Sequence, residues 1–225
     1  MLEVKNVKVE YYGEEVGTLN FAFNQGVTLI LGEVGSFKTT LFRVLGGIKE
    51  FDEGEIILDG ERIEELPPKK RDMAYVGLDS TPTSGNVVKA LMQPLRLRGV
   101  SKKEAFVAAD GAAQKFGLDS KRKIKALSKA ELVSFFKARL SLRNIAVTMF
   151  DEPYHYFGTE NAQSITDMIK SCGGYVLVSS CDGGDIERLK PDYLIVVRGD
   201  NLLQQGKTEE LIGSPASKYI EMFVK

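Results

Sequence analysis

The apolar and polar positions at the start of this chain predict β-structure. Leu2–Val9 alternates between the two classes, as a half-buried strand does, and a second short strand is expected at Thr18–Phe23. Asn24-Gln25-Gly26 is a turn sequence. Val27–Leu31, which follows it, is continuously apolar, a pattern typical of a strand covered on both faces.

Helical and extended patterns then alternate. A helix is expected at Thr39–Ile48, with Gly46-Gly47 near its end, and strands are expected at Gly54–Gly60 and Met73–Val76. Between Asn86 and Arg143 the periodicity is helical throughout. The predicted helices of that segment are Val87–Leu97, Lys102–Phe116 and Lys129–Leu142. Beyond it come predicted strands at Ile145–Phe150, Tyr175–Ser179 and Tyr193–Val197, with a helix at Asn161–Lys170.

Strands alternating with helices indicate an α/β core with a mostly parallel sheet that helices cover on both faces. The segment between residues 86 and 143 interrupts this alternation, so it is interpreted as a helical insertion. The length of 225 residues fits one domain with such an insertion.

Composition describes an ordinary globular protein, with 43% hydrophobic and 27% charged residues. The formal net charge of −1 gives no broad electrostatic reason to expect nucleic acid as a partner. Two short basic stretches, Lys69-Lys70-Arg71 and Lys121-Arg122-Lys123, are interpreted as solvated loops.

Cys172 and Cys181 do not suggest a disulfide framework in an intracellular protein. The N-terminal residues lack a signal sequence, and no apolar run approaches the ~20 residues that span a bilayer. We therefore expect a cytoplasmic location, and a role at the inner face of a membrane would require a separate spanning partner.

A glycine-rich loop follows the buried strand and leads into the first helix, which is the context of a phosphate-binding loop. Its residues are Gly32, Glu33, Val34, Gly35, Ser36, Phe37, Lys38, Thr39 and Thr40. The backbone N–H groups would face an anion, Lys38 would reach the β- and γ-phosphates, and the Thr39 hydroxyl would bind Mg²⁺. Phe37 stands where a third glycine is expected. Its side chain could crowd the loop or restrict its backbone, so the loop is expected to form but the sequence does not fix its affinity for nucleotide.

Two carboxylates, Asp151 and Glu152, follow the apolar run Ile145–Phe150. A parallel strand delivers them to the sheet edge where the loop lies. There Asp151 would hold Mg²⁺ and Glu152 would act as the general base. Alone, the same residues and Pro153 would also fit a helix N-cap. The preceding loop favours the nucleotide interpretation.

With these motifs in this order, the chain resembles the ATP-binding cassette (ABC) ATPase family along nearly its whole length. The resemblance implies a P-loop NTPase core, an N-terminal antiparallel β subdomain and an inserted α-helical subdomain. It divides a single domain of residues 1–225 into a core, 1–80 and 143–225, and a helical subdomain, 81–142. In this family a head-to-tail dimer holds two ATP molecules, each between one chain's loop and the other chain's signature segment.

The resemblance also assigns roles outside the loop. Tyr12 matches the aromatic residue that stacks on adenine, although it or Tyr11 could simply pack beside the strand. Leu127–Glu131 matches the signature segment and keeps its serine, Ser128, which would face the partner's ATP.

Several positions depart from the family pattern. Lys129 and Ala130 replace two signature glycines, Leu78 replaces a glutamine, and Cys181 replaces the switch histidine. Asp79 is a conceivable substitute for the glutamine. His155 lies in the loop whose closing aspartate is missing, and a packing or dimer-contact role is expected for it rather than metal binding.

The expected function is the ATPase subunit of a transporter, using ATP and Mg²⁺, docked on a membrane-spanning subunit. Because transition-state contacts commonly contribute on the order of 10²–10³-fold each in rate, the departures predict slow hydrolysis. They fall on both faces of the dimer, so a second, more conventional ABC ATPase chain is the expected partner. One alternative is a non-hydrolytic, nucleotide-gated structural or regulatory ABC subunit. The other is a soluble ABC protein with an assembly role.

Overall fold

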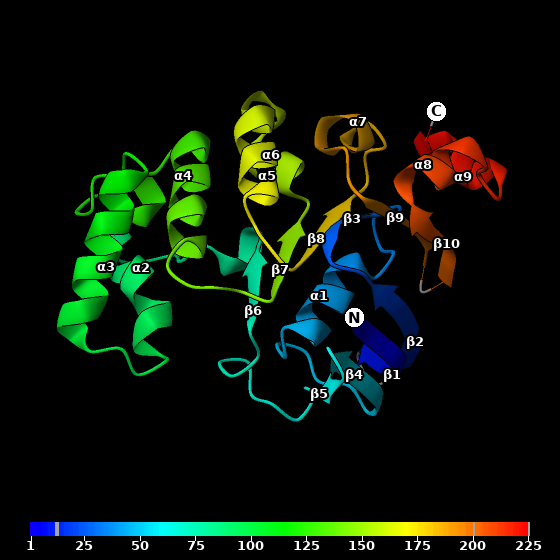
Figure 1. Cartoon of the computed structure of the whole chain (residues 1–225), viewed down its shortest axis with the longest axis horizontal. Coiled ribbons are helices and arrows are strands. Elements are labelled where there is room, and N and C mark those ends of the chain that lie inside the picture. Colours follow the sequence, from blue (N-terminus) through cyan, green and yellow to red (C-terminus); the bar gives the residue numbers. More distant parts are fainter. Residues whose placement is uncertain (12–13, 200, 225) are drawn as a thin grey trace.

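The computed structural model describes residues 1–11, 14–199 and 201–224, without the side chains of residues 11 and 14–16. Two sheets form its centre (Figure 1), and helices lie around them. Figure 1 shows α2, α3 and α4 together at one end, and β10, α8 and α9 at the other.

The smaller sheet is antiparallel, with strand order β2-β1-β4-β5. Its strands are β1 (Leu2–Tyr11), β2 (Glu14–Phe23), β4 (Glu53–Leu58) and β5 (Glu61–Arg62). Alternation along β1 places Leu2, Val4, Val7 and Val9 on the buried face, with a register irregularity between Val4 and Val7. This confirms the antiparallel subdomain.

The larger sheet has the strand order β10-β9-β3-β8-β7-β6. Its strands are β3 (Gly26–Leu31), β6 (Met73–Val76), β7 (Val147–Asp151), β8 (Tyr175–Ser180), β9 (Tyr193–Arg198) and β10 (Asn201–Lys207). Strands β9, β3, β8, β7 and β6 are parallel, while β10 pairs antiparallel with β9. The carboxyl ends of β3, β7 and β8 therefore meet at one edge.

Each face of this sheet contributes to a different hydrophobic core. Ile30 and Leu177 point to the core shared with α1 (Lys38–Leu45) and the antiparallel sheet. Their neighbours Leu29, Leu31 and Val176 point to the core shared with the other helices. Burial on both faces explains the continuous apolar runs of the sequence and confirms the covered sheet.

The inserted helices are α2 (Val87–Arg96), α3 (Lys102–Lys115) and α4 (Lys129–Leu140), which agree with the predicted positions. Asn86, Ser101 and Ser128 cap their N-termini. Ser101 and Ser128 also form capping boxes with Glu104 and Glu131.

The remaining helices are α5 (Pro153–Phe157), α6 (Ala162–Lys170), α7 (Asp185–Leu189), α8 (Thr208–Gly213) and α9 (Lys218–Val224). Short 3₁₀ turns lie at Leu78–Ser80, Ile124–Ala126 and Thr159–Asn161. Among the residues described, no helix has the length and apolar character needed to span a bilayer.

Arg71 is buried, so the interpretation of Lys69–Arg71 as a wholly solvated loop is wrong at this residue. Its side chain is 5% exposed and donates to four backbone carbonyls, those of Val44, Leu45, Glu64 and Leu66. Two of these belong to the last turn of α1, where carbonyls have no partner within the helix. Arg71 thus joins the end of α1 to the segment before β6.

Replacing Arg71 by methionine should lower the free energy of unfolding by about 3 kcal/mol, because buried carbonyls would lose charge-assisted hydrogen bonds. Methionine retains most of the apolar stem. Chemical denaturation measures the change, and Lys70→Met is the control, since Lys70 is exposed. A loss below about 0.5 kcal/mol, typical of exposed positions, would contradict this role.

Candidate functional site

The glycine loop connects β3 to α1, as the sequence predicts. Gly32 touches β9 so closely that a Cβ there would lie 2.6 Å from the Val197 carbonyl oxygen. Gly35 has a φ of +89°, which a side chain would strain. Around these turns Glu33 and Val34 are exposed, Ser36 is 6% exposed, and Thr40 is half-buried in α1.

Phe37 takes the left-handed conformation, with φ 52° and ψ 11°, at the N-cap of α1. A side chain costs roughly 1–2 kcal/mol in this conformation, which explains why glycine is expected here. The Phe37 ring packs partly buried in the core beneath the antiparallel sheet, close to Leu19, Phe21 and Leu41. Packing therefore offsets part of the backbone strain.

Two substitutions at Phe37 should separate strain from packing. Both Phe37→Ala and Phe37→Gly remove the ring, but only glycine relieves the left-handed conformation. We expect the glycine variant to be more stable than the alanine variant by about 1 kcal/mol. This reverses the usual order of the two residues. Thermal denaturation of both proteins measures it, and an alanine variant equal to or more stable than the glycine variant would contradict the assignment.

Lys38 is buried, 7% exposed, at the first position of α1. Its Nζ donates to the carbonyl oxygens of Gly32 at 2.6 Å and Glu33 at 3.0 Å. The same Nζ lies 3.6 Å from Glu152 Oε1. The ammonium group is therefore held within the loop, at the position from which it would reach an incoming phosphate.

Three hydroxyl groups converge on the Asp151 carboxylate at the end of β7. Thr39 Oγ1 and the Tyr75 hydroxyl each donate to Oδ2 at 2.8 Å, and Ser179 Oγ donates to Oδ1 at 2.6 Å. Burial, and then the charge of Asp151, raise the pKa of the Tyr75 phenol, so it remains a donor at neutral pH.

This set of donors fits Mg²⁺. The ion prefers hard oxygen ligands and usually takes only one or two from protein, the rest being water and phosphate. Thr39 Oγ1 and Asp151 supply such oxygens next to the phosphate loop. In the part of the chain that the structure describes, no cluster of three or more His, Cys, Asp or Glu residues forms a separate metal cage.

Glu152 follows directly and also takes a left-handed conformation, with a φ of 47°. Its N–H donates to Ser179 Oγ at 2.9 Å, and its Oε2 accepts from the Cys181 N–H at 3.2 Å. Burial, and then the neighbouring Glu152, raise the pKa of the Cys181 thiol. The Glu152 carboxylate is thus directed toward Lys38 and the loop, a place suited to a general base.

The other predicted site residues lie elsewhere. Ser128 caps the N-terminus of α4, which Figure 1 places among the inserted helices, separate from α1 and β3. The Ser128 hydroxyl accepts from the Glu131 N–H at 3.3 Å and donates to Glu131 Oε2 at 2.8 Å. Within one chain it does not join the loop, so its predicted contact needs a second chain. Tyr12 lies outside the described residues.

The substitute suggested for the missing glutamine is engaged elsewhere. Asp79 forms an ion pair with Arg43 of α1, which raises the pKa of the guanidinium. Asp79 would have to break this ion pair with Arg43 before it could contact the ligands of Mg²⁺. Leu78 is 73% exposed, and His155 is exposed on α5.

Tyr75 and Ser179 were not predicted from the sequence. Both lie in strands whose apolar patterns indicate only burial. The available signal was position. Ser179 lies next to the carboxyl end of β8, beside β7, and Tyr75 of β6 pairs with Met149 of β7. Because alternate residues share a face, Tyr75 lies diagonally across from Asp151.

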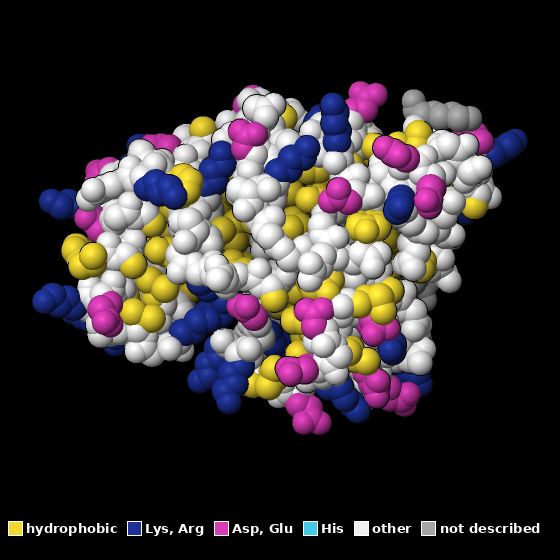
Figure 2. Space-filling model, in the orientation of Figure 1, with side chains coloured by type: hydrophobic (Ala, Val, Ile, Leu, Met, Phe, Trp, Pro, Cys, Tyr) yellow, Lys and Arg dark blue, Asp and Glu magenta, His cyan; other side chains and the backbone are white. Residues whose placement is uncertain are grey.

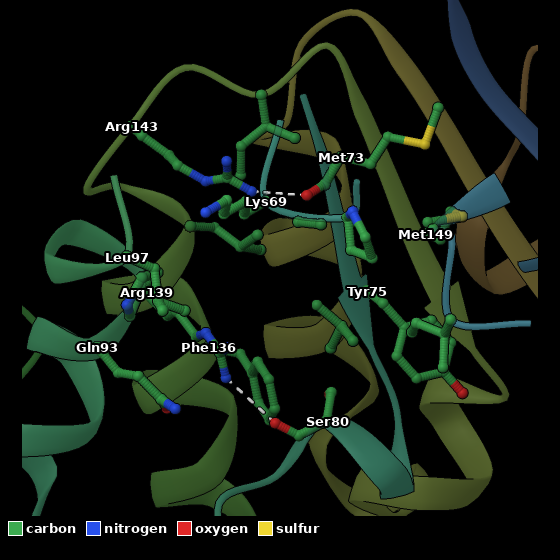
Figure 3. Close-up of a pocket in the computed structure, with 18 of the residues that line it drawn as sticks. Lys69, Met73, Tyr75, Ser80, Gln93, Leu97, Phe136, Arg139, Arg143 and Met149 are labelled. Atoms are coloured by element: carbon green, nitrogen blue, oxygen red, sulfur yellow. Dashed lines mark hydrogen bonds between the residues drawn. The ribbon is translucent and has the colours of Figure 1, made fainter. Parts of the chain in front are cut away.

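A groove of about 460 Å³ lies between the sheet and the inserted helices. Figure 2 shows Lys and Arg side chains gathered beside a hollow in this region. Its apolar lining includes the exposed Leu97 and the fully buried Phe136 and Met149. Its basic residues are Arg43, Lys69, Arg98, Arg139 and Arg143. Asp79 is the one acidic residue among the lining residues that the structure describes. Arg139 and Arg143 donate to backbone carbonyls of Ser80 and Met73 (Figure 3).

Comparison with known proteins gives consistent matches. The family model described as ABC transporter matches residues 16–155. The molybdate/tungstate import ATP-binding protein WtpC of Thermococcus kodakarensis is 26% identical over 231 residues, covering 100% of this chain and 70% of that protein. The sulfoquinovosyl glycerol transport ATP-binding protein SmoE of Agrobacterium fabrum is 26% identical over 214 residues, covering 92% and 60%.

The chain thus spans 60% to 70% of the length of these two relatives. Among solved structures, a nucleotide-free ATP-binding cassette from an ABC transporter superposes with a TM-score of 0.81 and 20% identity, covering 100% of this chain and 98% of that one. At this identity the likeness concerns the fold, and it confirms the α/β architecture.

Proposed function

The chain belongs to the ABC transporter family, and from that premise we propose that it is an ATP-binding subunit that couples ATP binding and slow hydrolysis to a membrane-spanning partner. The observation that best supports this is the meeting of Lys38 and Thr39 with Asp151 and Glu152 at one sheet edge. Thr39 and Asp151 are 112 positions apart in the sequence. They share a hydrogen bond because β3 and β7 are both parallel neighbours of β8.

Each of these residues has a definite task in the proposed reaction. Backbone N–H groups of Gly32–Thr40 bind the phosphates, and Lys38 exchanges its loop carbonyls for phosphate oxygens. Thr39 and Asp151 would hold Mg²⁺, which supplies neutralisation of phosphate charge. Glu152 accepts the proton of the attacking water as the bond from water to the γ-phosphorus forms. The bond from the γ-phosphorus to the bridging oxygen breaks in the same step, and ADP leaves with that oxygen.

Slow hydrolysis follows from the groups that are absent. Leu78 offers no polar atom where the family has a glutamine, and Cys181 offers only a thiol where it has a histidine. Lys129 and Ala130 add side chains where two glycines would let the backbone approach a phosphate. A homodimer would contain these defects at both of its sites. A second, more conventional ABC ATPase chain would supply a good signature segment to this chain's loop.

The groove is the surface we propose for the membrane-spanning partner. The exposed Leu97 beside the basic residues of this groove suits a partner segment that presents apolar and acidic side chains. On this proposal the protein lies at the inner face of the membrane, bound to that partner.

Affinity purification from detergent-solubilised membranes of the native host tests the proposed assembly. We expect a membrane-spanning protein and a second ABC ATPase to co-purify, and the double variant Lys69→Glu, Arg98→Glu to retain less of the membrane protein. The exposed double variant Lys102→Glu, Lys103→Glu on α3 is the control. Recovery of the chain alone, or full ATPase activity of the isolated chain at rates ordinary for the family, would contradict the proposal.

A further inference from the structure

Tyr75 connects two features of the molecule that the proposed function uses. Its ring lies in the wall of the groove, while its hydroxyl points away from Phe136 and Arg139 (Figure 3). That hydroxyl donates to Asp151 Oδ2 at 2.8 Å. Tyr75 therefore links the wall of the groove to the carboxylate that Thr39 also contacts.

The position of Asp151 depends on few groups. Tyr75 and Ser179 each hold one carboxylate oxygen, and Thr39 shares Oδ2 with Tyr75. The Thr39 hydroxyl uses its proton for this bond, which leaves its lone pairs free for a cation. The direction of those lone pairs depends on where Asp151 lies, and hence on Tyr75.

Gly77 provides the space that this arrangement needs. A Cβ at Gly77 would lie 3.1 Å from the Tyr75 hydroxyl oxygen and 3.1 Å from Asp151 Cβ. The φ of Gly77 is −178°, an extended conformation that any residue adopts, so backbone freedom is not the reason for glycine here. A Cβ would require Tyr75 or Asp151 to shift by a few tenths of an ångström. The phenol and the missing side chain at Gly77 therefore fit together as a pair.

We propose that Tyr75 is a positioning residue of the Mg²⁺ site, which holds the Asp151 carboxylate and, through it, orients the Thr39 hydroxyl. This rests on the proposed function. Leu78, next along the chain, has no group for this purpose, and Asp79 is paired with Arg43. Tyr75 is the residue of β6 whose polar atom reaches the carboxylate.

Tyr75→Phe removes the hydroxyl and keeps the ring. Since loss of a group that orients a metal ligand commonly weakens metal binding 10- to 100-fold, we expect Mg²⁺ affinity of the nucleotide complex to fall about tenfold. The affinity for fluorescent TNP-ATP in EDTA should stay unchanged, because Tyr75 does not contact the loop. Mn²⁺ binding followed by electron paramagnetic resonance, with competition by Mg²⁺, measures the first quantity, and fluorescence titration measures the second.

Tyr175→Phe is the matched control. Its hydroxyl also donates to a carboxylate, that of Asp59, but at the opposite end of the sheet. Unchanged Mg²⁺ affinity in Tyr75→Phe would overturn the proposal. An equal loss of nucleotide affinity with and without metal would also overturn it, because it would indicate a general structural role. If the unaltered chain binds no nucleotide at all, the proposed function itself fails and this assignment fails with it.

Discussion

Replacing Lys38 by alanine should weaken ATP binding about 100-fold, because it removes the cation that meets the β- and γ-phosphates. The buried ammonium is held by two loop carbonyls and lies beside Glu152. These partners are exchanged for phosphate oxygens when nucleotide binds, so the charge is already in place. Fluorescence titration with TNP-ATP, followed by competition with ATP, measures the loss.

The control for this experiment is Arg43→Ala, which removes a positive charge from the same helix. The Arg43 side chain pairs with Asp79 at the groove, outside the set of loop contacts made by Lys38. Its affinity for ATP should change less than about threefold. Melting temperatures of both variants report whether α1 is preserved. An unchanged affinity in folded Lys38→Ala would show that the loop is not the phosphate site.

Replacing Glu152 by glutamine should lower the rate of phosphate release by about 100-fold or more, with ATP binding retained. Glutamine keeps the shape and still offers an oxygen to the Cys181 N–H, so the left-handed turn at residue 152 is preserved. The amide cannot take a proton from water. Single-turnover phosphate release, at saturating enzyme in the assembled complex, measures the rate.

Glu187→Gln, an exposed position of α7, is the control for charge alone. Unchanged phosphate release in Glu152→Gln would favour the alternative of a nucleotide-gated subunit that does not hydrolyse ATP through this chain. A loss of ATP binding in the same variant would place Glu152 among the binding groups instead.

The loop and its carboxylates could be predicted because they are local patterns at strand ends. A continuous apolar run predicts β3. The glycine-rich residues between this strand and the following helix then predict a phosphate-binding loop. Register then brings Asp151 to the same edge, since β3 and β7 both run parallel to β8. The helices predicted at Val87–Leu97 and Lys102–Phe116 were similarly clear from periodicity, and the structure has them at Val87–Arg96 and Lys102–Lys115.

What the sequence did not show depends on contacts between distant residues. The burial of Arg71 follows from the end of α1 lying beside it, and the pairing of Asp79 with Arg43 has the same origin. The bond from Tyr75 to Asp151 needs the register of β6 against β7 and the empty space at Gly77.

Strand β10 and the short helices α5 and α7 were missed for a different reason. Strand β10 (Asn201–Lys207) lies at a sheet edge and is largely polar, so no apolar pattern marks it. Helices α5 and α7 are five residues each, too short for a periodic signal.

Isothermal titration of the purified chain with ATP, once with Mg²⁺ and once in EDTA, tests the central claim most directly. We expect one ATP per chain at the Gly32–Thr40 loop and tighter binding with Mg²⁺, because Thr39 and Asp151 add oxygens for the ion. Absence of binding at about 1 mM ATP in both conditions, corresponding to a binding free energy weaker than about −4 kcal/mol, would contradict the account.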